Sequence, residues 1–235
     1  MSENIKKITK AFKVDLDSRE NQSIILSTRP FNHQAHQVNE VPAKIAEKIY
    51  NLIEGTKYPN DDTILNHNEI KEVFFSPFEP QLKDAQVFLS HSHADKNKAL
   101  EVKNYLESET DHRVFIDSLF WDYKNNILKE MKKHHINVSK IEDAFTLILR
   151  ESLQDMIEKC PYFVFLQNNN SVSNQGLSCT TYSAWVYEEL KIAHSIRESR
   201  LTPMMESMQV FHDISPFLES LEIITLKELS HIINS

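Results

Sequence analysis

Glycine is the scarcest informative residue in this sequence, with only Gly55 and Gly176 among 235 residues. Glycine-rich phosphate loops need several glycines, because only this residue lets the backbone approach a phosphate closely. The chain can therefore form neither the dinucleotide-binding fingerprint nor a P-loop. This excludes Rossmann-type dehydrogenases and P-loop NTPases, while other ways of holding a nucleotide stay open.

Cysteines, long apolar runs and basic clusters are also scarce. Two cysteines, Cys160 and Cys179, in so long a chain indicate a reducing compartment. No run of about 18 apolar residues predicts a membrane span, and residues 1–7 lack the apolar segment of a signal peptide. A net charge of -8 without a basic patch argues against nucleic-acid binding. We expect a soluble, cytoplasmic protein that binds neither membranes nor nucleic acid.

The first 84 residues are polar and irregular, and we treat 1–84 as an N-terminal extension of unknown role. It contains a strand candidate at Ser23–Ser27 and an amphipathic helix candidate at Pro42–Glu54, which ends before Gly55. Two prolines within Ser76–Asp84 indicate a boundary. Residues 85–235 are then the main domain.

From residue 85 onward, apolar strands alternate with amphipathic helices. The strand candidates are Gln86–Ser90, Arg113–Ile116, Tyr162–Leu166, Gln209–Phe211 and Glu222–Thr225. The helix candidates are Asp95–Glu107, Asp143–Cys160 and a segment that begins near Ser183, and a charged insert runs to about Glu142. This alternation predicts an α/β fold with a parallel sheet of about five strands in a flavodoxin-like three-layer sandwich. Ligands of such sheets bind beyond the carboxyl ends of the strands.

The string His91-x-His93-x-Asp95 has the spacing of a zinc-hydrolase ligand set. Both histidines would face the same way on an extended backbone, and neutral imidazole suits zinc. Against this reading, Lys96 stands where a metallo-β-lactamase-like site has a further ligand, and that fold uses glycine-rich turns. A metal-dependent hydrolase, an ordinary polar loop and a ligand-binding loop without metal all stay open.

The segment Tyr182–Lys191 places a carboxylate among apolar residues. Trp185 and Glu189 are four residues apart and share one face of the predicted helix, for which Ser183 is a suitable N-cap. A carboxylate in an apolar stripe is costly unless it is paired, liganded or functional. The alternative is an acidic residue that stabilises the helix dipole beside a core tryptophan.

Four stretches together resemble Toll/interleukin-1 receptor (TIR) domains, especially bacterial ones. V-F-L-S-H-S-H-A-D-K (Val87–Lys96) resembles their first strand and loop, and R-V-F-I-D-S (Arg113–Ser118) their second strand. Y-F-V-F-L-Q-N-N-N-S (Tyr162–Ser171) resembles the strand after the middle helix. Trp185-x-x-x-Glu189 is similar to the W-x-x-x-E motif of NAD-consuming TIR domains, whose glutamate is catalytic.

The resemblance implies cleavage of the nicotinamide–ribose bond of NAD, with Glu189 as the catalytic residue and NAD as substrate rather than cofactor. Nicotinamide leaves as a neutral molecule, so one carboxylate suffices to stabilise the positive charge that develops on the ribose. The remaining expected substrate-binding residues are Ser90, His91, Ser92, His93, Asp117, Trp121 and Trp185. We expect either tryptophan to stack on a ring of NAD, and Asp117 to border a mobile loop.

The resemblance also implies self-assembly through TIR–TIR contacts and a role in bacterial antiphage defence. The product is either ADP-ribose, from hydrolysis, or a cyclic ADP-ribose that a downstream effector senses. A TIR-like interaction module without catalysis is the main alternative.

Overall fold

The computed structural model describes residues 10–27, 41–55, 66–76, 84–133, 139–175, 178–181, 183–198 and 212–235. The chain divides into two compact units. Unit 1 consists of residues 1–31, 84–117 and 153–235, and unit 2 of residues 32–83 and 118–152. Each unit is assembled from separate stretches of the chain. One passage between the units, from Lys83 to Asp84, coincides with the expected boundary, but residues 1–31 belong to the same unit as residues 84–117.

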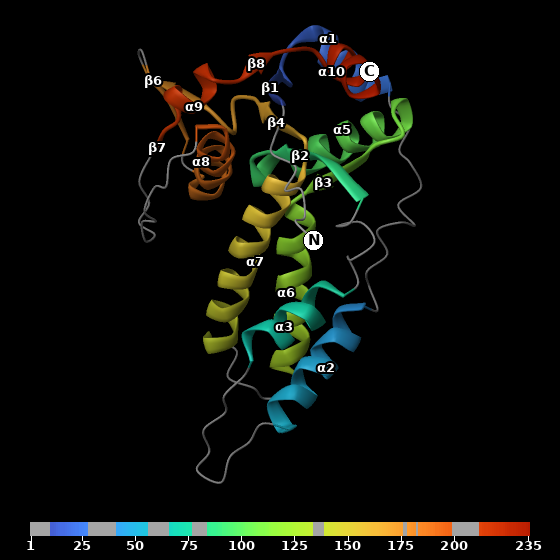
Figure 1. The fold of residues 1–235 in the computed structure, drawn as a ribbon, viewed down its shortest axis with the longest axis vertical. Coiled ribbons are helices and arrows are strands. Elements are labelled where there is room, and N and C mark those ends of the chain that lie inside the picture. The colour runs from blue at the N-terminus through green and yellow to red at the C-terminus, as the bar shows by residue number, and fades with distance from the viewer. Residues whose placement is uncertain are drawn as a thin grey trace, which may run out of the picture. The chain divides into compact units, whose positions relative to one another are not determined.

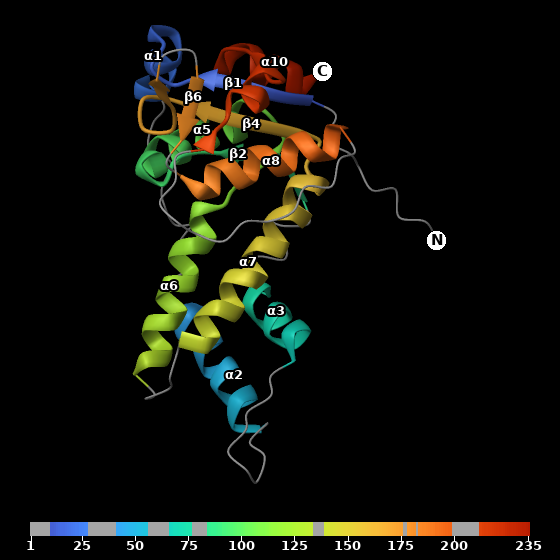
Figure 2. The ribbon, with the colours of Figure 1, turned by 90° about the vertical axis from the view of Figure 1, so that its left-hand side faces the viewer.

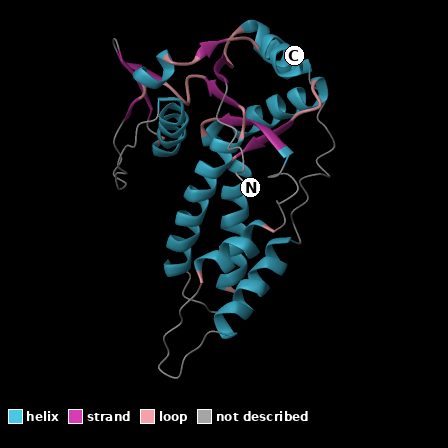
Figure 3. Ribbon diagram, viewed as in Figure 1, coloured by secondary structure: helices cyan, strands magenta, loops and turns pink. Residues whose placement is uncertain are grey.

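Unit 1 is built on a five-stranded sheet in which every strand pair is parallel, in the order β3-β2-β4-β1-β8 (Figure 1 and Figure 3). The strands are β1 (Lys10–Asp15), β2 (Ala85–Ser90), β3 (Arg113–Ile116), β4 (Tyr162–Gln167) and β8 (Glu222–Ile223). Helices flank this sheet. The expected α/β class with flavodoxin-like topology is confirmed.

Apolar side chains of the inner strands form the centre of unit 1. Phe163–Leu166 of β4 and Val87–Leu89 of β2 are almost completely buried, which is typical of parallel strands covered on both faces. The Phe88 ring stacks on Phe163 at a centroid distance of 5.8 Å and contacts Phe115 at 5.5 Å. Burial of each such side chain contributes about 1.5–3 kcal/mol, so these strands hold the carboxyl edge of the sheet in place.

The flanking helices of unit 1 follow from the direction of the strand connections. The helices are α1 (Arg19–Ser27), α5 (Lys96–Glu109), α8 (Ala184–Glu198), α9 (Ser215–Glu219) and α10 (Leu226–Asn234). Connections from β1 to β2 and from β2 to β3 run one way across the sheet, and the connection from β4 to β8 runs the other way. Right-handed crossovers therefore put α1 and α5 on one face and α8 on the other, where α8 lies against β2 (Figure 2).

Strand β1 is an inner strand that our sequence analysis does not predict. It pairs with β4 from Lys10↔Tyr162 to Asp15↔Gln167, and with β8 on its other side. The expected strand at Ser23–Ser27 is wrong, since these residues lie in α1. Six of the nine residues of α1 are Arg, Glu, Gln, Ser or Asn, five of them exposed, and only Asn21 and Ile25 of this helix are buried.

Unit 2 contains only helices among its described residues. These are α2 (Val41–Gly55), α3 (His67–Phe75), α6 (Ser118–Lys132) and the first part of α7 (Ser139–Lys159), which continues into unit 1. Helix α2 confirms the expected helix at Pro42–Glu54, and it packs against α3 and α6. Much of the expected charged insert is helical, because it belongs to α6 and α7.

An aromatic cluster joins the separate stretches of unit 2. Phe74 of α3 contacts Tyr123 of α6 at 5.1 Å and Phe145 of α7 at 5.0 Å between ring centroids. Phe74 and Phe145 are completely buried. The cluster is the core that makes residues 66–76 and 118–152 one unit.

A small antiparallel sheet is formed by three short strands that follow β4 in the chain. Its strands are β5 (Ser173–Gln175), β6 (Ser178–Thr181) and β7 (His212–Asp213). The expected strand Gln209–Phe211 lies outside the described residues, and the expected strand Glu222–Thr225 is confirmed as the two-residue β8.

Candidate functional site

The carboxyl ends of β2 and β3 meet the first turns of α8. Ser90 is the last residue of β2, Asp117 directly follows β3, and Trp185 and Glu189 lie one helical turn apart on α8. The topology explains this meeting, since β2 and β3 are adjacent parallel strands and α8 packs against β2. The structure therefore brings together four of the residues that the sequence singles out.

Hydrogen bonds join these four residues in two pairs. Ser90 Oγ donates to Glu189 Oε2 at 2.5 Å. The indole Nε1 of Trp185 donates to Asp117 Oδ2. Trp185 therefore takes part in the site through its N–H group, a role that its position in the sequence does not indicate.

His91 is the fifth member of the site. Its Nδ1 lies 3.5 Å from Asp117 Oδ1, and the side chain is almost completely buried. Burial lowers the pKa of His91, against the opposing effects of Asp117, a backbone contact with Leu89, and Asp95. His91 is thus held close to a carboxyl group while burial favours its neutral form.

Glu189 has the most perturbed environment of the described residues in the site. Its side chain is completely buried, and this burial raises its pKa well above 4.5. The charge of Asp117 and a hydrogen-bond contact with it raise the pKa further, while the hydrogen bonds of Ser90 and Trp185 lower it. Strongly perturbed pKa values cluster at functional sites, so the raised pKa of Glu189 marks it as a candidate functional residue.

For three other expected site residues, the structure shows only their own surroundings. His93 is exposed, and the carbonyl of the buried Ser92 accepts a backbone hydrogen bond from Asp95 at 2.8 Å. Trp121 lies on α6 in unit 2, where the Nζ of Lys124 lies 4.9 Å from its ring centroid. The structure does not assign a place beside Glu189 to any of the three.

The residues of the His91-x-His93-x-Asp95 string face different surroundings. His91 lies against Asp117, His93 is exposed, and Asp95 accepts a hydrogen bond from Asn170 Nδ2 at 2.9 Å. Within the described ranges, no three His, Cys, Asp or Glu side chains are grouped so that they could hold a metal ion. The geometry does not favour the metal-dependent alternative.

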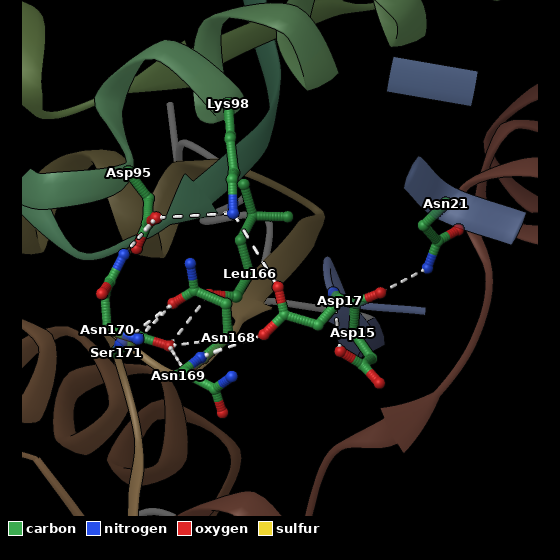
Figure 4. A network of polar contacts seen from close by, with 10 residues as sticks. All are labelled: Asp15, Asp17, Asn21, Asp95, Lys98, Leu166, Asn168, Asn169, Asn170 and Ser171. Atoms are coloured by element: carbon green, nitrogen blue, oxygen red, sulfur yellow. Dashed lines mark hydrogen bonds and ion pairs between the residues drawn. The ribbon is translucent and has the colours of Figure 1, made fainter. Parts of the chain in front are cut away.

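A second cluster of polar residues, which the sequence does not predict, holds the loop that follows β2 (Figure 4). Asn169 N donates to Asp17 Oδ2 at 3.2 Å, which links the residues after β4 to those after β1. The Nζ of Lys98 lies 3.8 Å from Asp17 and 4.0 Å from Asp95. Asp95 thus ties the loop after β2 to the ends of β1 and β4, much as His91 ties it to the end of β3.

Comparisons with protein-family models, with curated proteins and with solved structures find no match to this chain. Among the helices of the described residues, none combines the length and the apolar character that crossing a membrane requires.

Proposed function

We propose that this chain is a TIR-like enzyme that cleaves the nicotinamide–ribose bond of NAD, with Glu189 as the catalytic residue. The observation that carries the proposal is the placement of Glu189. It lies on α8 beside the carboxyl end of β2, fully buried, hydrogen-bonded to Ser90 and one turn from Trp185. Ligands of parallel α/β sheets bind at this edge, and the four TIR-like stretches of the sequence contribute to it.

The proposed chemistry needs one negative charge in a water-poor site. As the C–N bond breaks, its electron pair leaves with nicotinamide, which departs neutral, and positive charge develops on the ribose. A carboxylate of Glu189 stabilises that charge strongly in such surroundings. Water then adds to the ribose carbon and loses a proton, which gives ADP-ribose, or an adenine nitrogen adds instead, which gives a cyclic product.

The candidate site is closed to solvent. Glu189 is 0% exposed and Asp117 is 5% exposed, so NAD reaches Glu189 only after neighbouring groups move. A closed resting site supports an enzyme that is switched on by assembly, as the TIR resemblance implies for cellular antiphage signalling. We therefore expect activity to rise more steeply than in proportion to protein concentration.

Nicotinamide release from NAD tests the proposal. The full chain is incubated with NAD over a wide range of protein concentrations, and nicotinamide is quantified by chromatography. Glu189→Gln should lower the rate by about 10²-fold or more, because the charge that stabilises the ribosyl cation is lost. The matched control is Glu188→Gln, the same change at the half-buried neighbouring position, which should keep the wild-type rate.

Two outcomes contradict the proposal in different ways. Release that persists in Glu189→Gln removes Glu189 from the catalytic role. No release at any concentration, with self-association intact, favours the alternative of a TIR-like interaction module. The complete burial of Glu189 supports this alternative, because a buried side chain does not meet NAD unless neighbouring groups move.

A further inference from the structure

Two carboxyl groups lie side by side in the interior of unit 1. Glu189 from α8 is completely buried and Asp117 after β3 is 5% exposed, and the charge and side chain of Asp117 both act on Glu189. Two neighbouring carboxylates that have both left water cannot both ionise without a large free-energy penalty. The usual solution is one proton held between them.

The hydrogen-bond donors around the two carboxyl groups leave one oxygen of Glu189 on which that proton can lie. Ser90 Oγ donates to Glu189 Oε2, and Trp185 Nε1 donates to Asp117 Oδ2. Glu189 Oε1 is buried without a hydrogen-bond donor among the described residues. Carboxylates only accept hydrogen bonds, whereas a protonated carboxyl group also donates one. A proton on Oε1 would satisfy this atom and let Glu189 donate to Asp117.

The other titratable groups near the pair are histidine and aspartate side chains of the loop after β2. His91 faces Asp117, and Asp95 and His93 act on His91 in turn. Burial lowers the pKa of His91, so the neutral ring adds no full positive charge beside the pair.

We propose that Asp117 and Glu189 share one proton and a single negative charge, and that Asp117, held by the indole N–H of Trp185, is a positioning residue for Glu189. During the reaction the proton shifts from Glu189 to an oxygen of Asp117, which leaves Glu189 as the carboxylate beside the ribosyl cation. No other reactant is needed for this shift. The catalytic part of this inference rests on the proposed function, whereas the shared proton does not.

Infrared spectroscopy of the purified full chain tests the shared proton without any substrate. Wild-type protein at pH 7 should show the C=O stretch of a protonated carboxyl group, and Glu189→Gln should abolish this band. Glu188→Gln should keep it. A wild-type spectrum without the band, or a band that survives in Glu189→Gln, overturns the inference.

Two variants should shift the titration of that band in opposite directions. Asp117→Asn removes the charge that raises the pKa of Glu189, so the band should disappear at a lower pH than in the wild type. Trp185→Phe keeps a ring but removes the N–H hydrogen bond that lowers this pKa, so the band should persist to a higher pH. Equal titration in all three proteins overturns the pairing, and each variant reports independently if the other fails to fold.

Kinetics separates the positioning role of Trp185 from ring stacking on the substrate. We expect Trp185→Phe and Asp117→Asn each to lower kcat by about 10²-fold with little change in KM, because Glu189 is misplaced. The kcat of the double variant should be no lower than that of Asp117→Asn alone, since both changes break one chain of contacts.

If Asp117→Asn keeps the wild-type kcat and only raises KM, Asp117 does not position Glu189, while the proposed cleavage of NAD still holds. A confirmed infrared band without any nicotinamide release contradicts only the proposed function.

Discussion

At the scale of single residues, the most informative group is a carboxyl group that the fold keeps out of water. Folding raises the pKa of Glu189 above its ordinary value, mainly by burial and next by Asp117. Between the unfolded and folded pKa values, the folded chain holds a proton that the unfolded chain has released. The free energy of unfolding therefore falls as pH rises through this window.

Glu189→Gln should remove this loss of stability with rising pH, since glutamine does not ionise. We expect the variant to be more stable than the wild type at pH 7, with a gain that is small near pH 4.5, the ordinary pKa, and grows as pH rises. Urea unfolding of both proteins across this range, followed by circular dichroism, gives the difference. Glu188→Gln, the same change at the half-buried neighbouring position, is the matched control. A stability gain in Glu189→Gln that is equal at all pH values would contradict the raised pKa.

The sequence predicts the members of the site better than their roles. Glu189, Trp185, Ser90 and Asp117 could be selected because each lies at a strand end or on one helix face, and those positions follow from alternation and helical spacing. The bond between Trp185 and Asp117 joins residues far apart in the sequence, so no local pattern indicates it. Trp121 belongs to unit 2, and its expected stacking role stays a prediction.

At the scale of secondary-structure elements, the sequence predicts the nearly apolar strands β3 and β4 but not the mixed strand β1. Residues 162–166 and 113–116 form unbroken apolar or nearly apolar runs, and both are strands as expected. Strand β1 reads K-A-F-K-V-D, with lysines at two of its six positions. Its pairing with β4 is a tertiary interaction that overrides this weak local signal.

The inner position of β1 predicts a large effect of its apolar side chains on stability. Phe12 is 1% exposed and lies in the register Phe12↔Val164 between two strands. Phe12→Ala should lower the free energy of unfolding by about 3–5 kcal/mol, because it leaves a cavity between sheet and helices. Leu26→Ala on α1 removes a side chain that is 85% exposed and should change stability by less than about 0.5 kcal/mol. Urea unfolding measures both, and equal effects would exclude β1 from the core.

At the scale of the whole chain, two units are interleaved. The chain passes between unit 1 and unit 2 after residues 31, 83, 117 and 152. Asp117 of the candidate site is thus the last residue of unit 1 before α6 begins. Sequence patterns predict α2 and most of α7 but neither α3 nor α6, and the association of these helices depends on contacts such as Phe74 with Tyr123.

Each unit has its own buried core, so we expect the two to lose structure separately. Phe74→Ala removes a completely buried ring at the centre of the aromatic cluster of unit 2, which should cost about 3–5 kcal/mol locally. Amide hydrogen exchange followed by mass spectrometry should then show faster exchange in α2, α3 and α6, while β2 and β4 of unit 1 keep their protection. Leu147→Ala, on α7 in the same unit but half exposed, should leave exchange in α2 and α3 unchanged. Faster exchange throughout β2 and β4 in Phe74→Ala would instead show that the two units unfold as one cooperative structure.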